Sequence, residues 1–145
     1  MTEVRELVEG ETRLAVPALR ELRPHLGSDA EVVARIDRVQ RPDGYRLLGV
    51  LEEGAEVAVA VAGFRALRNL AWGDVVYVDD LVTRADARGR GHATRLLEAI
   101  DELARAAGYG GVHLDSGVGP DRAAAHRRYL GHGYRISSHH FQRDL

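Results

Sequence analysis

The sequence contains no cysteine and no lysine, so all 20 of its basic residues are arginines. The absence of cysteine excludes disulfides, cysteine-ligated zinc, iron–sulfur clusters and thiol nucleophiles. The absence of lysine excludes a Walker A phosphate loop, a Schiff-base lysine and pyridoxal phosphate chemistry. Long apolar runs are also missing: the longest, residues 57–62, is far too short to cross a bilayer. We therefore expect neither a membrane protein nor an enzyme that uses a thiol or a lysine.

What is present is typical of a globular chain. The 145 residues are 45% hydrophobic and 29% charged, and a chain of this length can bury a core of its own. We expect residues 1–145 to form a single domain. Residues 1–6 (MTEVRE) are charged and have no apolar segment for a signal peptide, so we expect a cytoplasmic location.

Charge is distributed unevenly, although the net charge is only −2. Residues 1–83 hold 10 arginines and 15 acidic residues, whereas residues 84–145 hold 10 arginines and 7 acidic residues. This asymmetry favours an anionic ligand at the C-terminal half and a cationic ligand nearer the front. Ordinary scatter of surface charges explains it equally well.

Hydrophobic periodicity predicts six strands and four helices. The strands are expected at residues 4–8, 45–51, 56–64, 74–83, 112–116 and 134–141. The helices are expected from Thr12 to Pro24, from a capping box at Ser28–Glu31 to Arg41, from Ala93 to Gly108 and from Pro120 to Tyr129.

The order of these elements predicts an α/β (α+β) fold with a mixed, mostly antiparallel sheet. The helix that ends at Gly108 joins strands 74–83 and 112–116, and a crossover of this kind makes its two strands parallel neighbours. The hairpins that precede this pair are expected to be antiparallel. Both faces of strand 56–64 are apolar, so we expect helices on both faces of the sheet.

Residues 88–93 (RGRGHA) lie between a buried strand and the longest helix and carry the clearest chemical signal. Glycines let the backbone pass close to a ligand, and the first N–H groups of a helix have no intrahelical partner. Together with the helix dipole these groups favour a pyrophosphate, and Arg88 and Arg90 add positive charge. The alternative is a sharp turn whose arginines are merely solvated.

Two motifs in the sequence resemble those of the GNAT superfamily of N-acetyltransferases. Arg88-x-x-Gly91-x-Ala93 is similar to its acyl-CoA signature, Arg/Gln-x-x-Gly-x-Gly/Ala. Residues 125–134 (AHRRYLGHGY) resemble its Ala-x-x-Phe-Tyr-x-x-x-Gly-Phe segment. The order of elements agrees along nearly all 145 residues, so the resemblance covers essentially the whole chain.

The resemblance implies that the chain uses acetyl-CoA as co-substrate and no metal. Residues 88–93 would hold the pyrophosphate, and the pantetheine arm would run along residues 81–83, where the parallel strands splay apart. The cofactor-binding residues that we expect are Leu81, Val82, Thr83, Arg88, Gly89, Arg90, Gly91, His92, Ala93 and Arg122. Arg122 departs from the family, which commonly has asparagine there; Arg128 likewise replaces an aromatic residue, so the local cofactor contacts are open.

The catalytic residues expected are Tyr129, Asp79 and Asp80. By the resemblance Tyr129 is the general acid that protonates the leaving thiolate; otherwise it packs against the last strand. An attacking amine must lose a proton, and Asp79 or Asp80 could accept it. Strand alternation places the two on opposite faces, with Asp79 slightly favoured. Either carboxylate could instead bind the cation of the substrate or cap a loop.

We therefore expect an N-acetyltransferase that moves acetyl from acetyl-CoA to a primary amine of a small molecule or protein by direct attack. The alternative is a non-catalytic acyl-CoA-binding sensor. The resemblance suggests a homodimer, and it places Arg20, Arg23 and His25 where family members shape the acceptor pocket, although solvated surface is the default for these three residues. Nucleic acid is not expected as a partner, because the chain has no basic helix with interleaved aromatic residues. A membrane partner is not expected either.

Overall fold

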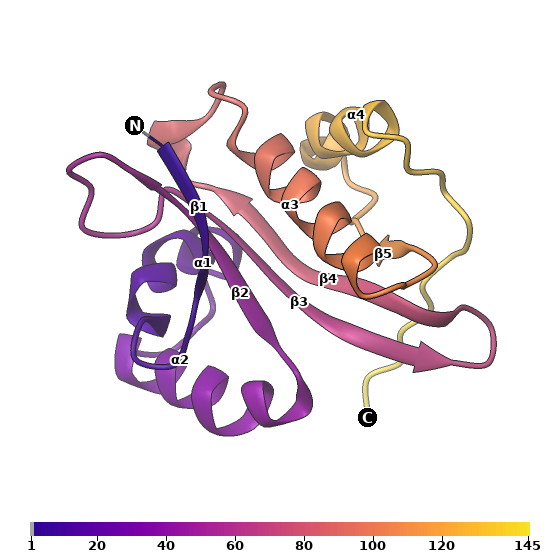
Figure 1. Ribbon diagram of the computed structural model, residues 1–145, viewed down its shortest axis with the longest axis horizontal. Coiled ribbons are helices and arrows are strands. Elements are labelled where there is room, and N and C mark those ends of the chain that lie inside the picture. Colours follow the sequence, from indigo (N-terminus) through magenta and orange to yellow (C-terminus); the bar gives the residue numbers. More distant parts are fainter. Residues whose placement is uncertain (1) are drawn as a thin grey trace. The chain divides into compact units, whose positions relative to one another are not determined.

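The computed structural model describes residues 2–145 and contains five strands and four α-helices within that range (Figure 1). In chain order they are β1 (Thr2–Leu7), α1 (Val16–Leu22), α2 (Asp29–Arg35), β2 (Arg46–Glu52), β3 (Ala60–Asn69), β4 (Gly73–Thr83), α3 (His92–Ala106), β5 (Val112–Leu114) and α4 (Ala123–Gly131). The chain falls into two compact units, a larger one that ends at His113 and a smaller one, Leu114–Leu145.

The strands form one sheet in the order β1-β2-β3-β4-β5. The first four are antiparallel neighbours, whereas β4 and β5 are parallel and joined through α3. Backbone hydrogen bonds connect the start of β4 with the chain entering β5, from Val76 N to Gly111 O at 3.0 Å and from Gly110 N to Asp74 O at 2.9 Å. The expected mixed, mostly antiparallel sheet with one parallel pair is therefore confirmed.

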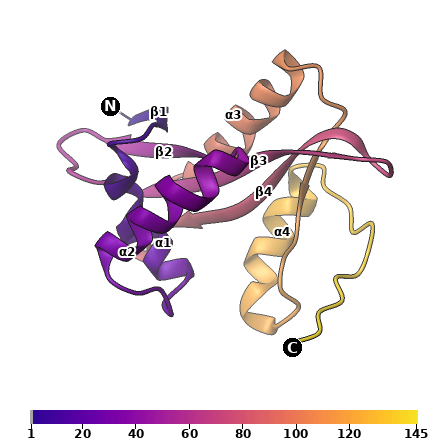
Figure 2. The same ribbon diagram turned by 90° about the horizontal axis from the view of Figure 1, so that it is seen from below.

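Helices cover both faces of the sheet in the larger unit. Figures 1 and 2 show α1 and α2 against one face and α3 against the other. The apolar side of α3 is buried completely at Leu96, Leu97 and Ile100. Val61, near the start of β3, is also fully buried. Burial on both sides explains why the apolar residues of β3 do not alternate with polar ones. No helix among residues 2–145 is both long and apolar enough to span a membrane.

Strand β3 begins at Ala60, four residues later than the expected strand at 56–64. Gly54 makes the turn after β2 with a φ of +77°. Before the strand starts, Ala58 N donates to Leu14 O at 3.0 Å, outside the sheet. The chain between Gly54 and Ala60 is thus partly bound to the helical segment that precedes α1, which periodicity alone does not predict.

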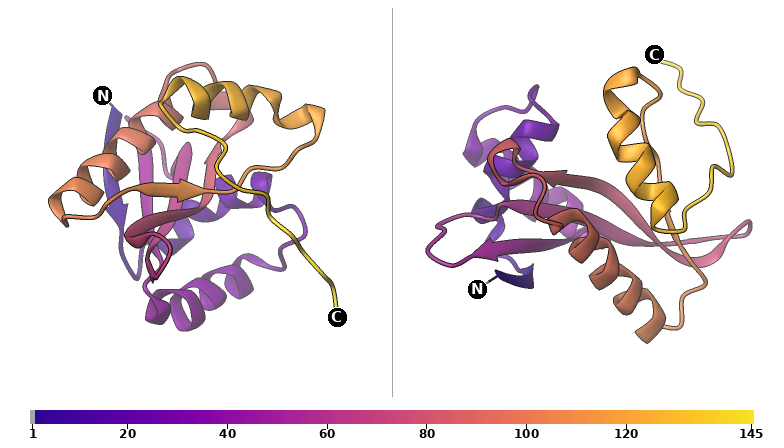
Figure 3. Two further views of the ribbon diagram at one scale, coloured as in Figure 1. Left: turned by 90° about the vertical axis from the view of Figure 1, so that its right-hand side faces the viewer. Right: turned by 90° about the horizontal axis from the view of Figure 1, so that it is seen from above.

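The prediction of a strand at residues 134–141 is wrong. Within the described chain, α4 ends at Gly131 and no strand follows it (Figure 3). The apolar side chains that suggested alternation are largely exposed, Ile136 at 80% and Phe141 at 92%. A strand is stabilised by hydrogen bonds to a neighbour and by burial of one face, and a sequence pattern supplies neither. Strand β5 likewise ends at Leu114 rather than at residue 116.

Candidate active site

The loop between β4 and α3 has a backbone suited to a bound anion. Gly89 and Gly91 both have a φ of +79°, a conformation that side chains rarely adopt, and a Cβ at either position would meet only open space. Gly91 occupies the N-cap of α3, so no capping side chain covers the first helical N–H groups. The loop therefore presents free donors at the positive end of a 15-residue helix.

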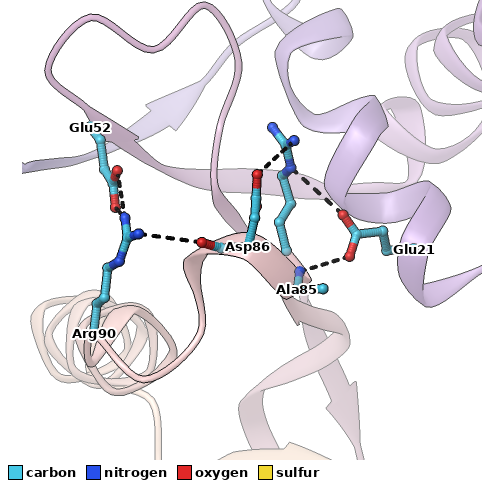
Figure 4. Close-up of polar contacts among 6 residues, drawn as sticks. Glu21, Glu52, Ala85, Asp86 and Arg90 are labelled. Carbon is cyan, nitrogen blue, oxygen red and sulfur yellow. Dashed lines mark hydrogen bonds and ion pairs between the residues drawn. The ribbon is translucent and has the colours of Figure 1, made fainter.

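Glu52, at the end of β2, binds one side of this loop (Figure 4). Arg90 Nη1 donates to both carboxylate oxygens of Glu52, at 2.7 and 2.9 Å, and its Nη2 donates to Asp86 O at 3.3 Å. The hydrogen bond from Arg90, followed by the one from His92, lowers the pKa of Glu52. The charge of Arg90, which was expected to serve the ligand, is thus already opposed by a carboxylate.

His92 was expected only as a member of the loop, but its imidazole lies in the interior. It is 3% exposed, and Nε2 lies 2.9 Å from Glu52 Oε1. The other ring nitrogen, Nδ1, is buried with no hydrogen-bond partner among residues 2–145. His92 and Arg90 therefore share one carboxylate, which ties the first residue of α3 to the end of β2.

Glu21, on α1, binds the opposite side of the loop (Figure 4). Its Oε1 accepts a 2.8 Å hydrogen bond from Ala85 N, and its Oε2 lies 3.6 Å from Arg84 Nε. Arg84 Nη2 also lies 3.2 Å from Asp86 Oδ2. Arg88 differs, since in the described chain its Nε donates only a long 3.5 Å hydrogen bond, to Thr83 O. Arg88 is thus the loop arginine most available to a ligand.

The strand before this loop is irregular at the two aspartates. Gly63 is opposite Asp80 and Phe64 is opposite Val78, so Asp79 is an extra residue on β4. Such a bulge interrupts the simple alternation that the sequence suggested. Asp79 accepts hydrogen bonds from Arg65 Nε at 3.0 and 3.2 Å. Burial raises the pKa of Asp79, and the contacts with Arg65 offset part of that rise.

Asp80 has different partners, Tyr45 and Arg23. The Tyr45 hydroxyl donates to Oδ2 at 2.7 Å, and Arg23 Nε donates to Oδ1 at 3.1 Å. Tyr45 is 4% exposed, and burial together with the neighbouring Asp80 raises its pKa well above the ordinary value. A Cβ at Gly63 would overlap the Tyr45 hydroxyl, so only glycine there leaves room for this contact.

A pocket of about 490 Å³ opens beside Asp80. It lies within the larger unit and is walled by α1, α2 and the helical turns that follow α2, with Tyr45 and Asp80 contributed from the sheet side. Arg23 and His25 also line it, as the resemblance implied, whereas Arg20 and Asp79 are not among the lining residues. Of the two aspartates, it is therefore Asp80 that a ligand in this pocket would meet.

Tyr129 and Arg122 belong to the smaller unit. Tyr129 lies on α4, is 9% exposed, and its ring centre is 5.8 Å from that of Tyr134. Burial raises the pKa of Tyr129, while Arg122 and Arg128 act in the opposite direction. The Asp79–Thr83 stretch and residues 88–93 belong to the larger unit. That Tyr129 acts on a ligand held by the loop stays a prediction.

Sequence reasoning missed Tyr45, Gly63, Glu21 and Glu52. Each contacts a site residue that is distant in sequence, for example 35 residues between Tyr45 and Asp80 and 38 between Glu52 and Arg90. No local motif marks such pairs. A glycine inside an apolar strand was the one available signal, because it often indicates close approach by another group.

Comparison with known proteins places the sequence in a family. The sequence pattern described as "Acetyltransferase (GNAT) family" matches residues 9–134. A Bacillus subtilis (strain 168) protein described as "Uncharacterized N-acetyltransferase YhdJ" is 32% identical over 130 residues, covering 89% of this chain and 88% of that protein.

Solved structures share the fold at lower sequence identity. A Trypanosoma brucei acetyltransferase matches with a TM-score of 0.82 and 23% identity, covering 100% of both chains. The aminoglycoside N-acetyltransferase AAC(6')-Iy in complex with CoA matches with a TM-score of 0.83 and 15% identity, covering 100% of this chain and 95% of that one. The same enzyme in complex with a bisubstrate analogue matches at 0.83 and 17%, covering 100% and 99%.

The fold, the loop and the sequence match point to the same enzyme class. The expected fold and the expected acetyl-CoA-dependent acyltransferase class are both confirmed. The family pattern spans most of the chain, and the curated relative exceeds 30% identity over nearly its whole length. The chain belongs to the GNAT family of acetyltransferases.

Proposed function

We propose that this chain transfers the acetyl group of acetyl-CoA to a primary amine by direct attack. The loop of residues 88–93 carries the proposal: two glycines at positive φ, an uncapped helix start and a weakly engaged Arg88 together fit a pyrophosphate. The CoA complex of AAC(6')-Iy, which shares the fold, supports the same ligand class. Leu81, Val82 and Thr83 are the last residues of β4 and are proposed to bind the pantetheine arm.

The reaction needs no covalent enzyme intermediate. The amine nitrogen attacks the thioester carbonyl carbon, the new C–N bond forms, the C–S bond breaks, and the CoA thiolate leaves. The amine gives up one proton and the thiolate takes one up, so protons balance. The absence of cysteine leaves no acetyl-cysteine route. We propose that Tyr129 supplies the proton to the thiolate; its raised pKa keeps the phenol protonated at neutral pH.

We propose that the acceptor amine enters the pocket beside Asp80. The place of Asp80 on the pocket wall supports this, as does its position next to residues 81–83. Asp80 would then hold the ammonium or accept its proton. Asp79 remains the competing base, because burial raises its pKa towards the working range. The expected homodimer, single domain and cytoplasmic location stay predictions.

Two measurements test the proposal. Calorimetry with CoA should show binding that weakens several-fold in Arg88→Gln, whereas Arg95→Gln, an exposed arginine further along α3, should bind CoA as the wild type does. Thiol release from acetyl-CoA should then depend on an added primary amine. CoA binding without turnover on any amine would favour a non-catalytic acyl-CoA sensor, and no CoA binding at all would contradict the proposal.

A further inference from the structure

The pocket beside Asp80 is electrically balanced, although the front half of the sequence is acidic. Its charged lining consists of Arg23 and Arg35 against Glu31 and Asp80, together with His25. Asp80 already lies 3.1 Å from the guanidinium of Arg23 and accepts the Tyr45 hydroxyl. The negative charge of Asp80 is thus partly neutralised before any ligand arrives.

The second pair of opposite charges lies on α2. Glu31 and Arg35 are four residues apart, which places them on one face of the helix one turn apart. The Glu31 carboxylate is folded against Gly27 on the same wall of the pocket. Within this pocket two carboxylates are matched in number by two guanidinium groups, so the lining leaves no excess of negative charge for a ligand with several cations.

The rest of the wall is apolar. Leu19, Leu26, Val32 and Ile36 line the pocket, and Leu19, Val32 and Ile36 are at most 6% exposed, so they form a fixed surface. The volume of about 490 Å³ suits a compact molecule. An apolar ligand that covers this surface gains binding free energy from the apolar area that is buried. A chain of ammonium groups would instead lose part of its hydration on contact with this surface, which disfavours binding.

We propose that the acceptor is a monoamine on a compact apolar body, and that Arg35 helps to exclude polyamines. This inference rests on the proposed function and names its substrate class. The first ammonium meets Asp80, whose partners limit how much further positive charge the pocket tolerates. A second ammonium in the pocket would meet the guanidinium of Arg35. The charge asymmetry of the whole sequence therefore does not extend to the pocket.

The test compares 2-phenylethylamine with spermidine and with an aminoglycoside, by kcat/KM for thiol release from acetyl-CoA. The wild type should prefer the monoamine at least tenfold. Arg35→Gln should reduce this preference roughly threefold, which is the effect expected of one like charge that is exposed to solvent. Arg38→Gln removes the same charge from the same helical region outside the pocket and should leave the preference unchanged.

Equal or better turnover of either polyamine by the wild type would overturn the inference. An identical change of preference in Arg35→Gln and Arg38→Gln would also overturn it, because the effect would then come from the net charge of the protein and not from a group in the pocket. Calorimetry with CoA separates this from the proposed function. If CoA binds but 2-phenylethylamine is not acetylated, the substrate class is wrong; if CoA does not bind, the proposed function itself fails.

Discussion

The hydroxyl of Tyr45 donates a 2.7 Å hydrogen bond to Oδ2 of Asp80 from a side chain that is only 4% exposed. Its partner carboxylate lies on the pocket wall and is also bound by Arg23. A buried tyrosine that reaches a pocket carboxylate in this way restricts the rotation of that carboxylate. Asp80 therefore presents a defined orientation to a ligand rather than a mobile charge.

Replacing Gly63 by alanine should disturb this contact. A Cβ at position 63 would overlap the Tyr45 hydroxyl and crowd its ring, so we expect a loss of roughly 1–3 kcal/mol in the free energy of unfolding. Urea denaturation measures it. Gly111→Ala is a suitable control, because its Cβ would make only ordinary van der Waals contacts with His113 and Val75, the nearest at 3.7 Å. Equal effects at the two glycines would contradict the steric explanation.

Glu52→Gln should change acyl-CoA binding through Arg90. The substitution removes the charge that opposes the Arg90 guanidinium, so we expect CoA to bind several-fold more tightly at low ionic strength. The gain should disappear as salt is added. Glu56→Gln, an exposed residue with the same change of charge, should show little effect in the same calorimetric titration. Weaker binding in Glu52→Gln would instead mean that Glu52 is needed mainly to hold the loop in shape.

Asp79 should reveal its raised pKa in the pH dependence of stability. A group whose pKa is higher in the folded state favours folding at low pH, and this contribution is lost as the pH rises through the folded-state value. Asparagine does not ionise, so Asp79→Asn does not lose stability in this way. As the pH rises from below the ordinary aspartate pKa, the unfolding free energy of the variant should therefore increase relative to that of the wild type. Chemical denaturation at several pH values measures the difference. A difference that is constant with pH would contradict the direction of the shift.

The pH–rate profiles of Asp79→Asn and Asp80→Asn identify the base. Replacing the residue that accepts the amine proton should abolish the acidic limb of the kcat/KM profile. Replacing the other aspartate should leave that limb in place. If Asp80 only binds the ammonium, its variant should raise KM for the amine and retain the shape of the profile. Retention of the acidic limb in both variants would exclude a direct proton transfer to either side chain.

Tyr129→Phe should lower kcat by about a hundredfold if the phenol protonates the leaving thiolate. CoA affinity should change little, because only the hydroxyl is removed. Since burial raises the pKa of Tyr129, the wild type should show no basic limb from this residue below the ordinary tyrosine value. Tyr109→Phe, at a position where the hydroxyl accepts a hydrogen bond from Arg68, is the matched control. An unchanged kcat would leave Tyr129 with a packing role.

The elements with long, regular patterns were predictable from sequence. The apolar side of α3, its end near Gly108 and the long buried strand β4 all follow from periodicity and from glycine chemistry. The Ser28 cap was also visible, and Glu31 N does donate to Ser28 Oγ at 3.2 Å. These features depend on residues within one or two turns of each other, which a sequence shows directly.

Contacts between distant segments were not predictable. Alternation along β4 predicted opposite faces for the two aspartates, yet the bulge at Asp79 depends on how β3 pairs with β4. The pairing of Arg90 with Glu52 depends on the end of β2 lying next to the loop. The residues near Phe141 have a strand-like sequence pattern but form no strand, because a strand also needs a neighbouring strand for its backbone hydrogen bonds.

The two carboxylates that bind residues 84–92 come from α1 and from β2, and each precedes the residues that it contacts by at least 38 positions in sequence. The shape of the loop is therefore encoded outside the motif by which it is recognised. A peptide that copies residues 84–106, or a graft of that segment into another scaffold, would contain every motif residue and still lack the groups that set the arginines and the helix start in place. A graft meant to keep the conformation of residues 84–92 would need Glu21 and Glu52 as well.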